Sequence, residues 1–494
     1  MELALEKRHV KYCTRVMAQR IRCEAMQEMI VPDACQDIAL VAGTSGDVMV
    51  DSRILTAGKL SVGGRVAAKV LYVGENGALE SLALTIPFRA DWENSRIPDG
   101  GAVRLRPRLE DITVRELNPR KVLVRVNVAI DGEIFICQEK EFCTDAGLQE
   151  GLYRKKGRLD TEVLASLDEK EITVSDRLEL TVAKPPAKAL LRSGVQLVAG
   201  DSKAVGGKVI FKGGARIDVC YLSDANTTER ASFELPFSQI IDCSCEDAAG
   251  CAVNMYLCDG GVELAADRDG RSFDVDLTVM VQALCSTRQE IEYLSDMYSS
   301  RGEVSCEREQ IVLSCPAENI KKSVTLREMI DTGTPAVSVA DVNVRLSEPK
   351  CAESGWVCDG EVSVIFTDER GAASGAGRVI KVPCPAELAE GASANLAGEI
   401  TARCTSGAAE VEFTVEFTCA GSHEAEFTPV TGADMVPLQG GGDFCGAVLC
   451  RTEGESLWEI CRRYRADPDL TAELNSLQDG RPAADTFLLI PIEG

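Results

Sequence analysis

The sequence predicts a mainly β protein, with three tandem β-sandwich-like domains followed by a small β-α-α-β domain. Three observations lead to this fold class. Apolar and polar residues alternate strictly in several segments, as strands with one buried face require. One hairpin-like layout occurs three times, and two short helical patterns follow near the C-terminal end. The 42 glycines and the aromatic content of 5% also favour strands and turns over helices.

The repeated layout is an alternating strand, a polar turn, and a second strand that ends in an apolar residue, Pro, and Phe or Cys. The copies are GGRVAAKVLYVGENGALESLALTIPF, ending at Phe88, GARIDVCYLSDANTTERASFELPF, ending at Phe237, and DGEVSVIFTDERGAASGAGRVIKVPC, ending at Cys384. Tyr72 and Pro87 have the same separation as Tyr221 and Pro236. Each copy therefore predicts a hairpin with a longer loop.

A further alternating strand follows each hairpin: KVLVRVNVAI from Lys121, DVDLTVMVQA from Asp274 and EVEFTVEFTC from Glu410. The lead-ins before the first two hairpins, EMIVPDACQDIALVAG and LELTVAKPPAKALLRSG, predict a strand, a proline-marked break and a short helical turn. The repeat is too long for a solenoid unit, so tandem domains are predicted. We place them at 1–150, 165–305 and 310–424, with a linker at 425–445 and the last domain at 446–494.

These repeats resemble SPOCS domains, which occur in spore coat morphogenesis proteins of endospore-forming Firmicutes. The resemblance rests on VPDACQDIALV from Val31, on the hairpin endings IPF and LPF, and on YLSDMYSS from Tyr293 to Ser300. The third repeat departs from the pattern, because it lacks the Val-Pro-Asp lead-in and has Pro-Cys in place of Pro-Phe. The resemblance implies a role in spore coat assembly.

The C-terminal segment combines two helix signals with two flanking strands. Ser456 and Glu459 form a capping-box pattern, and Asp467 followed by Pro468 is a favoured helix start. Apolar residues at helical spacing line one face of the first predicted helix: Leu457, Ile460, Cys461 and Tyr464. Strand-like GAVLC from Gly446 and TFLLIP from Thr486 enclose the two helices.

This order, with GESLWEICRRY, a helix ending at Asn475 and a final LLIP, resembles a LysM domain. LysM domains typically bind N-acetylglucosamine-containing glycans through two loops. The resemblance implies that these residues bind a glycan or a protein partner: Glu453, Gly454, Glu455, Ser456, Asn475, Ser476, Leu477 and Gln478. Gly454, Ser456 and Asn475 also suit turns and caps. We expect Trp458 to be packed rather than stacked on sugar.

The charge balance narrows the classes of partner. With 53 basic and 78 acidic side chains, the formal net charge is −25, which repels nucleic acid and anionic lipid. The sequence contains no run of about 18 apolar residues that would span a membrane. It also lacks the start of a signal peptide, so we expect a cytosolic protein whose 21 cysteines are mostly reduced.

The residues that most enzymes and metal sites need do not assemble into a recognisable pattern. The only histidines are His9 and His423. The cluster Cys243, Cys245, Cys251 and Cys258 matches no closed zinc or iron-sulfur spacing. Its cysteines are expected to be small buried apolar residues, with metal binding and late oxidative cross-linking as alternatives. We therefore predict no catalytic residues, no cofactor and no metal.

Two functions stay open. The first is a non-enzymatic scaffold or adaptor in the mother-cell cytoplasm, at the forespore or coat surface, whose tail docks a morphogenetic protein such as the coat-basement ATPase. The alternative is a cell-wall or cortex protein whose tail binds peptidoglycan. The missing signal peptide favours the scaffold. A hydrolase with a wall-targeting tail is disfavoured, because no catalytic constellation is present.

Overall fold

The computed structural model describes residues 3–266, 269–353, 355–369, 371–386, 392–405, 407–438, 446–477, 482–483 and 485–492. In these ranges the chain forms 23 strands and two short helices, which confirms the mainly β class. None of the helices found there is both long and apolar enough to cross a membrane.

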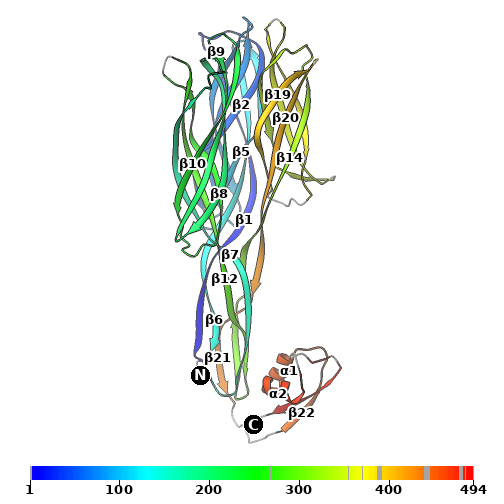
Figure 1. Cartoon of the computed structure of the whole chain (residues 1–494). Helices are drawn as coiled ribbons and strands as arrows, with labels where there is room; N and C mark the ends of the chain where they lie inside the picture. Colours follow the sequence, from blue (N-terminus) through cyan, green and yellow to red (C-terminus); the bar gives the residue numbers. More distant parts are fainter. Residues whose placement is uncertain are drawn as a thin grey trace.

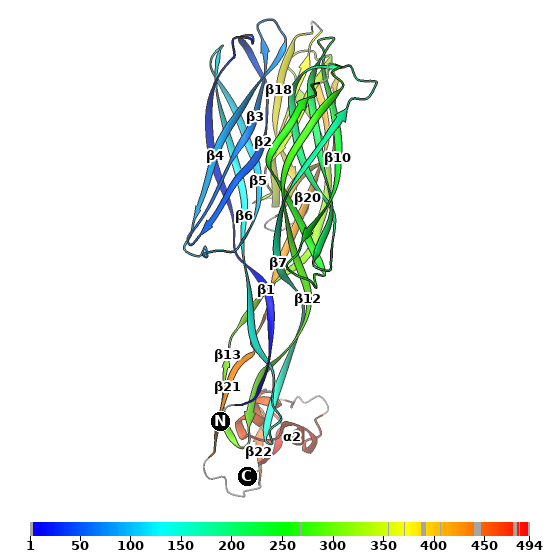
Figure 2. The same ribbon diagram turned by 90° about the vertical axis from the view of Figure 1, so that its left-hand side faces the viewer.

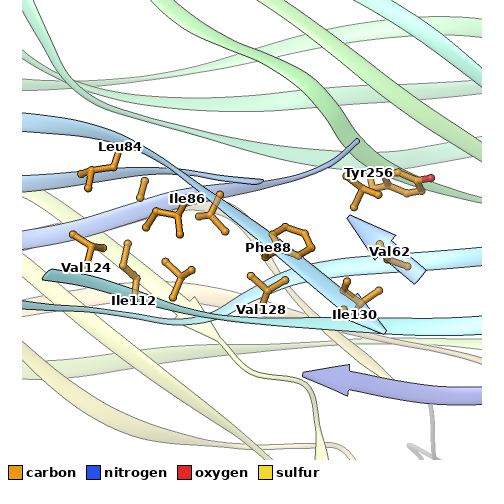
Figure 3. Packing of buried hydrophobic residues seen from close by; sticks show 14 of the residues in the cluster. Val62, Leu84, Ile86, Phe88, Ile112, Val124, Val128, Ile130 and Tyr256 are labelled. Carbon is orange, nitrogen blue, oxygen red and sulfur yellow. The ribbon is translucent and has the colours of Figure 1, made fainter. Parts of the chain in front are cut away.

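The first repeat folds as two three-stranded antiparallel sheets packed face to face. One sheet has the strand order β1-β6-β5 and the other β2-β3-β4. The strands are β1 (Leu5–Ile30), β2 (Ile38–Thr56), β3 (Lys59–Gly74), β4 (Leu79–Glu93), β5 (Ala102–Asn118) and β6 (Lys121–Ala146). Side chains from both sheets, including Val62, Ile86, Phe88 and Val128, form one core (Figure 3). This arrangement is a β-sandwich.

The second and third repeats have the same topology. The second pairs β11-β12-β7 and β10-β9-β8, while the third pairs β14-β20-β19 and a sheet in which β17 lies between β15 and β18. The second contains β7 (Leu152–Glu179), β8 (Ala187–Val205), β9 (Lys208–Ser223), β10 (Thr228–Asp242), β11 (Gly250–Leu264) and β12 (Ser272–Ser299). The third contains β14 (Ile311–Asp331), β15 (Ser338–Leu346), β16 (Lys350–Ala352), β17 (Gly355–Thr367), β18 (Ala373–Pro383), β19 (Ser393–Thr405) and β20 (Ala408–Phe427).

The three predicted hairpins are β3-β4, β9-β10 and β17-β18. Their prolines, Pro87, Pro236 and Pro383, all lie on strands at the edge of a sheet, where a missing N–H removes no ladder bond. Phe88 and Phe237 stand opposite Gly64 and Gly213, whose missing Cβ atoms leave room for the rings. The Pro-Phe pattern therefore marks an edge strand whose aromatic ring covers a glycine.

The lead-ins differ from the prediction of a short helical turn. In the first, the Cys35 N–H donates to the Pro32 carbonyl at 2.9 Å, and β2 then begins at Ile38. The lead-in is thus a tight turn between two strands. The buried Tyr221 donates its hydroxyl hydrogen bond to the Pro185 carbonyl of the next lead-in. The third repeat has Phe366 at the corresponding position and lacks such a hydroxyl, in keeping with its divergent lead-in.

The three sandwiches lie side by side in one elongated head (Figures 1 and 2). A small apolar cluster with members from all three, including Leu71, Leu191 and Ile365, lies where they meet. Tyr256 of the second sandwich also joins the core of the first, and Met49 of the first joins the core of the second. Ion pairs add polar contacts to these interfaces. Arg192 of the second sandwich forms a bidentate pair with Asp341 of the third, at 2.6 Å for each bond, and both side chains are buried.

Each remaining interface also has an ion pair. Arg53 pairs with Glu169 between the first and second sandwiches, with an Nη2–Oε2 distance of 2.5 Å. Arg108 pairs with Glu348 between the first and third at 2.5 Å. The fully buried Gln282 donates to the Val103 carbonyl at 2.7 Å. Because buried charges need matched partners, these contacts hold the sandwiches in one relative orientation.

A stalk extends from one end of the head (Figure 1). It consists of the far halves of the paired strands β1-β6 and β7-β12, the ends of β14 and β20, and the pair β13 (Gly302–Arg308) with β21 (Val430–Pro437). Phe142 and Phe427 meet edge to face in its core, with centroids 5.5 Å apart. Two boundaries differ from the sequence-based ones, since β7 begins at Leu152 and β21 occupies part of the expected linker 425–445. Both stretches are rich in charged or small residues, because a narrow stalk buries fewer positions than a sandwich.

The C-terminal unit, residues 446–492 as described, lies at the free end of the stalk (Figures 1 and 2). Its elements are β22 (Gly446–Arg451), α1 (Leu457–Tyr464), α2 (Pro468–Leu474) and β23 (Phe487–Ile492). The two strands pair antiparallel, and Ile460, Cys461 and Ile490 are fully buried in its core. The predicted β-α-α-β element order is therefore present.

Candidate functional site in the C-terminal unit

The first predicted binding loop, Glu453 to Ser456, is shaped by the start of α1. The Ser456 hydroxyl accepts a hydrogen bond from the Glu459 N–H at 3.3 Å, and the Glu459 carboxylate accepts one from the Ser456 N–H at 2.8 Å. This capping box lowers the pKa of Glu459, chiefly through the Ser456 N–H. Glu455 pairs with Arg463, and Gly454 has a φ of 95°, in the left-handed region that glycine tolerates. The polar groups of the loop are thus largely used locally.

The second predicted loop is held by Asn475. Its side-chain N–H₂ donates to the Leu489 carbonyl at 2.7 Å, and its side-chain oxygen accepts from the Leu489 N–H at 2.7 Å. The amide thereby satisfies the exposed edge of β23. Ser476 is exposed, and Leu477 packs against the core of the unit. Gln478 lies outside the described residues.

Thr452 connects the start of the first loop to the segment before β23. It is fully buried immediately before the first loop, and its N–H donates to the Thr486 carbonyl at 2.9 Å. Its hydroxyl donates to the Ala483 carbonyl at 2.6 Å. The exposed residues that the structure describes in the two predicted loops are Glu453, Gly454, Ser456 and Ser476. We call these four residues the rim, and none of them carries an aromatic side chain.

Trp458 faces the stalk. Its indole N–H donates to the Asp296 carboxylate at 2.7 Å, and its ring meets Tyr298 at a centroid distance of 4.9 Å and an interplanar angle of 65°. Arg462 also binds the Asp296 carboxylate at 3.0 Å. The Tyr298 hydroxyl donates to the Ala466 carbonyl at 2.7 Å. This contact, which we call the joint, confirms that Trp458 is packed.

The joint residues on the stalk were missed by sequence reasoning. Asp296 and Tyr298 belong to YLSDMYSS, which was recognised only as a family-like motif. They lie near the end of β12, where the second repeat reaches the tip of the stalk. A tyrosine and a carboxylate near the end of a strand indicate a contact with another part of the chain. The sequence does not indicate which part, because Trp458 lies far along the chain.

The outer face of the β22-β23 pair is apolar and uncovered. Leu449 and Leu489 stand opposite each other, with exposed fractions of 64% and 42%, and Phe487 is 62% exposed. Their strand neighbours Cys450, Leu488 and Ile490 point into the core. We call Leu449, Phe487 and Leu489 the apolar face. Alternation in the sequence predicts two faces here, but it does not predict that the outer face stays apolar.

The predicted cysteine cluster does not assemble as one group. Cys243 and Cys285 are neighbours, with their sulfur atoms 3.2 Å apart, and Cys251 pairs with Cys285 across β11 and β12. Cys258 packs instead against the core of the first sandwich. Cys13 and Cys137 form a disulfide between β1 and β6, and no other disulfide forms among the cysteines that the structure describes.

Other candidate features carry no recognisable site. His9 is exposed beside Glu139 and Glu141, and His423 lies opposite Cys315 on β14. A shallow depression of about 400 Å³ on the first sandwich is lined by charges that already pair, such as Arg22 with Glu110.

Comparison with known proteins adds no relative, because no family model, curated protein or solved structure matches this chain.

Proposed function

We propose that this protein is a non-enzymatic scaffold or adaptor in spore coat assembly, with the C-terminal unit docking a morphogenetic protein of the coat-basement ATPase type. The proposed location is the mother-cell side of the forespore surface. The proposal combines the SPOCS-like and LysM-like sequence patterns with one structural observation. That observation is the apolar face of Leu449, Phe487 and Leu489 at the free end of the molecule.

The apolar face favours a protein partner. Burying exposed leucine and phenylalanine side chains contributes roughly 25 cal/mol for each Å² removed from water, and protein interfaces use such residues at their centres. Arg451 and Asp485 form an ion pair beside Phe487 and give the apolar face a polar border. A two-stranded apolar face with a polar border is suited to binding the surface of a folded protein.

The same geometry makes a glycan a weaker candidate. Sugar rings commonly stack on an aromatic face, but Trp458 is held in the joint and the described loop residues carry no other aromatic side chain. Ser456 and Asn475 use their side chains to cap α1 and to bind β23. The glycan alternative rests on the exposed rim of Glu453, Gly454 and Ser476.

The head and stalk fit the role of a spacer. The three sandwiches are joined by one buried and two partly buried ion pairs, and the stalk places the C-terminal unit far from them (Figure 1). One molecule is thereby able to engage coat components at the head and a morphogenetic protein at the tail.

The test compares binding of the purified full chain to a purified coat-basement ATPase and to peptidoglycan. Leu449→Asp with Phe487→Asp is expected to abolish ATPase binding, whereas Glu453→Gln with Ser476→Ala is expected to leave it intact. Val379→Asp is the matched control, because Val379 is a 75% exposed apolar residue on the head. Co-sedimentation with peptidoglycan that chitin oligosaccharides compete away, and that the rim variant loses, would replace the proposal by the glycan alternative.

A further inference from the structure

The second sandwich gathers thiols and a carboxylate where its long strands leave the head. The last residue pair between β11 and β12 is Gly250 with Ser286, and beyond it β12 pairs with β7 alone. Cys285 lies directly before this point on β12, and Asp168 lies close by on β7. Cys243 follows β10 and folds onto both strands.

The ligand atoms of Asp168, Cys243 and Cys285 lie within 4.8 Å of one another. The two sulfur atoms are 3.2 Å apart, and both thiols are buried. In a tetrahedral zinc site, with Zn–S bonds of about 2.3 Å, two sulfur ligands stand about 3.8 Å apart. A side-chain adjustment of about 0.5 Å therefore brings the two sulfur atoms to the spacing that zinc requires.

We propose that Asp168, Cys243 and Cys285 bind a thiophilic divalent cation, with Zn²⁺ as the best match. Two thiolates and one carboxylate suit zinc, whereas magnesium and calcium prefer oxygen ligands alone. Binding exchanges two thiol protons, which leave to solvent, for one divalent cation. The resulting Zn–S and Zn–O bonds require no oxidant or reductant.

The surroundings orient the proposed ligands as an outer shell of a metal site does. The Asp168 carboxylate accepts hydrogen bonds from the Ser244 N–H at 3.1 Å and from the Ser166 hydroxyl at 2.6 Å. The Cys245 N–H donates to the Cys243 sulfur at 3.4 Å. Backbone N–H groups that point at a sulfur stabilise its bonding to a metal. The Cys245 thiol is not one of the three ligand atoms that lie within 4.8 Å of one another, so the fourth position falls to water.

A cation fits this cluster better than a second disulfide. The Cys13–Cys137 disulfide joins β1 and β6. Cys137 lies just beyond Phe135, the last residue of β6 that pairs with β5, at the start of that strand. The second sandwich adds Asp168 to its thiol pair and holds the carboxylate with two serine residues. A disulfide does not need that carboxylate, whereas a bound cation gains a third anionic ligand from it.

The experiment loads the reduced full chain with Co²⁺ or Zn²⁺ and measures the metal content and the Co²⁺ absorption spectrum. We expect one equivalent of metal and a sulfur-to-cobalt charge-transfer band. Cys243→Ser, Cys285→Ser and Asp168→Asn are expected to lose the bound equivalent. Cys258→Ser is the matched control, because Cys258 lies on β11 but packs against the first sandwich.

A milder variant gives a test that does not depend on whether the buried thiol variants fold. The Ser244 hydroxyl also donates a hydrogen bond to the Asp168 carboxylate. Ser244→Ala removes this bond and is expected to weaken zinc binding by about 10- to 100-fold while the chain stays folded. The proposal is overturned if the reduced wild-type chain binds no metal. Two further results would also overturn it. One is that Cys258→Ser loses as much metal as Cys285→Ser. The other is that Cys243 and Cys285 remain joined by a disulfide after treatment with reductant and zinc.

Discussion

The head and the C-terminal unit are attached to their neighbours by different kinds of contact. In the head, the buried Arg192–Asp341 pair joins two sandwiches through charges that are almost completely removed from water. At the stalk tip, Trp458 and Tyr298 form an aromatic contact beside a single carboxylate, Asp296. The two contacts respond differently to the loss of one partner.

A buried charge without its partner is far more costly than a lost surface contact. Separating the sandwiches would therefore cost the head much of its stability. The core around Ile460 and Ile490 also contains Tyr298 of the stalk, but its other buried members belong to the C-terminal unit. We therefore expect that breaking the joint detaches the unit without unfolding it. We infer that the head provides a fixed frame and that the tail is a separable module.

The largest expected effect is on the head. Asp341→Ala leaves the Arg192 guanidinium buried without its bidentate partner, and we expect a loss of about 3–5 kcal/mol in the free energy of unfolding. Urea unfolding followed by circular dichroism measures it. Asp359→Ala is the control, because Asp359 pairs with Lys350 at the surface and should cost at most about 1 kcal/mol. Equal losses would remove the contrast between buried and surface pairs.

The next effect is confined to the tail. Ile460→Ala creates a cavity in a small core and is expected to destabilise the C-terminal unit by about 2–5 kcal/mol. Limited proteolysis should then release fragments of the tail while the head stays intact. Leu474→Ala serves as the control, since Leu474 is 50% exposed. If the whole chain becomes protease-sensitive, the tail is not a separate module.

The free energy of unfolding is expected to depend on pH through Asp47, which lies at the interface between the first and second sandwiches. Burial raises the pKa of Asp47 to about 6, although the Val195 N–H and the charges of Arg192 and Lys69 oppose the shift. A folded-state pKa above the unfolded one means that the folded state holds the proton more tightly. This contribution to stability is complete below about pH 4 and is lost as the pH rises through about 6.

Asp47→Asn removes that titration. We expect the stability of the wild type relative to this variant to fall by about 1–3 kcal/mol between pH 4 and pH 7. Denaturant midpoints at several pH values measure the difference. Parallel curves for the two proteins would show that Asp47 does not carry the predicted shift.

The smallest effect concerns the joint. Trp458 lies between the tail and the stalk, so Trp458→Ala is expected to detach the tail and leave it folded. Trp458→Phe removes the hydrogen bond to Asp296 and is expected to weaken the joint by about 1–2 kcal/mol. Small-angle scattering should show a wider range of tail positions, with the melting of the tail unchanged. A lower melting temperature of the tail would instead support a role in its core.

The hairpins and helix caps were predictable because their signals are local. Val66, Val70 and Tyr72 share the buried face of one strand, and Ser456 and Glu459 are three positions apart in one turn. Such patterns reflect backbone geometry and the burial of one face, which neighbouring residues determine. The lead-in turn was misread because a proline break followed by polar residues is compatible with a helical turn and with a β-turn.

By itself, then, the sequence determined the β class, the three repeated hairpins and the two capped helices, all of which depend on residues close in the chain. Tertiary structure alone decided that Asp296 meets Trp458, that Asp168 meets Cys243 and Cys285, and that the outer face of β22-β23 remains uncovered. These contacts join residues far apart in the chain. Which strands lie side by side depends on the packing of whole sheets, and no local pattern encodes it.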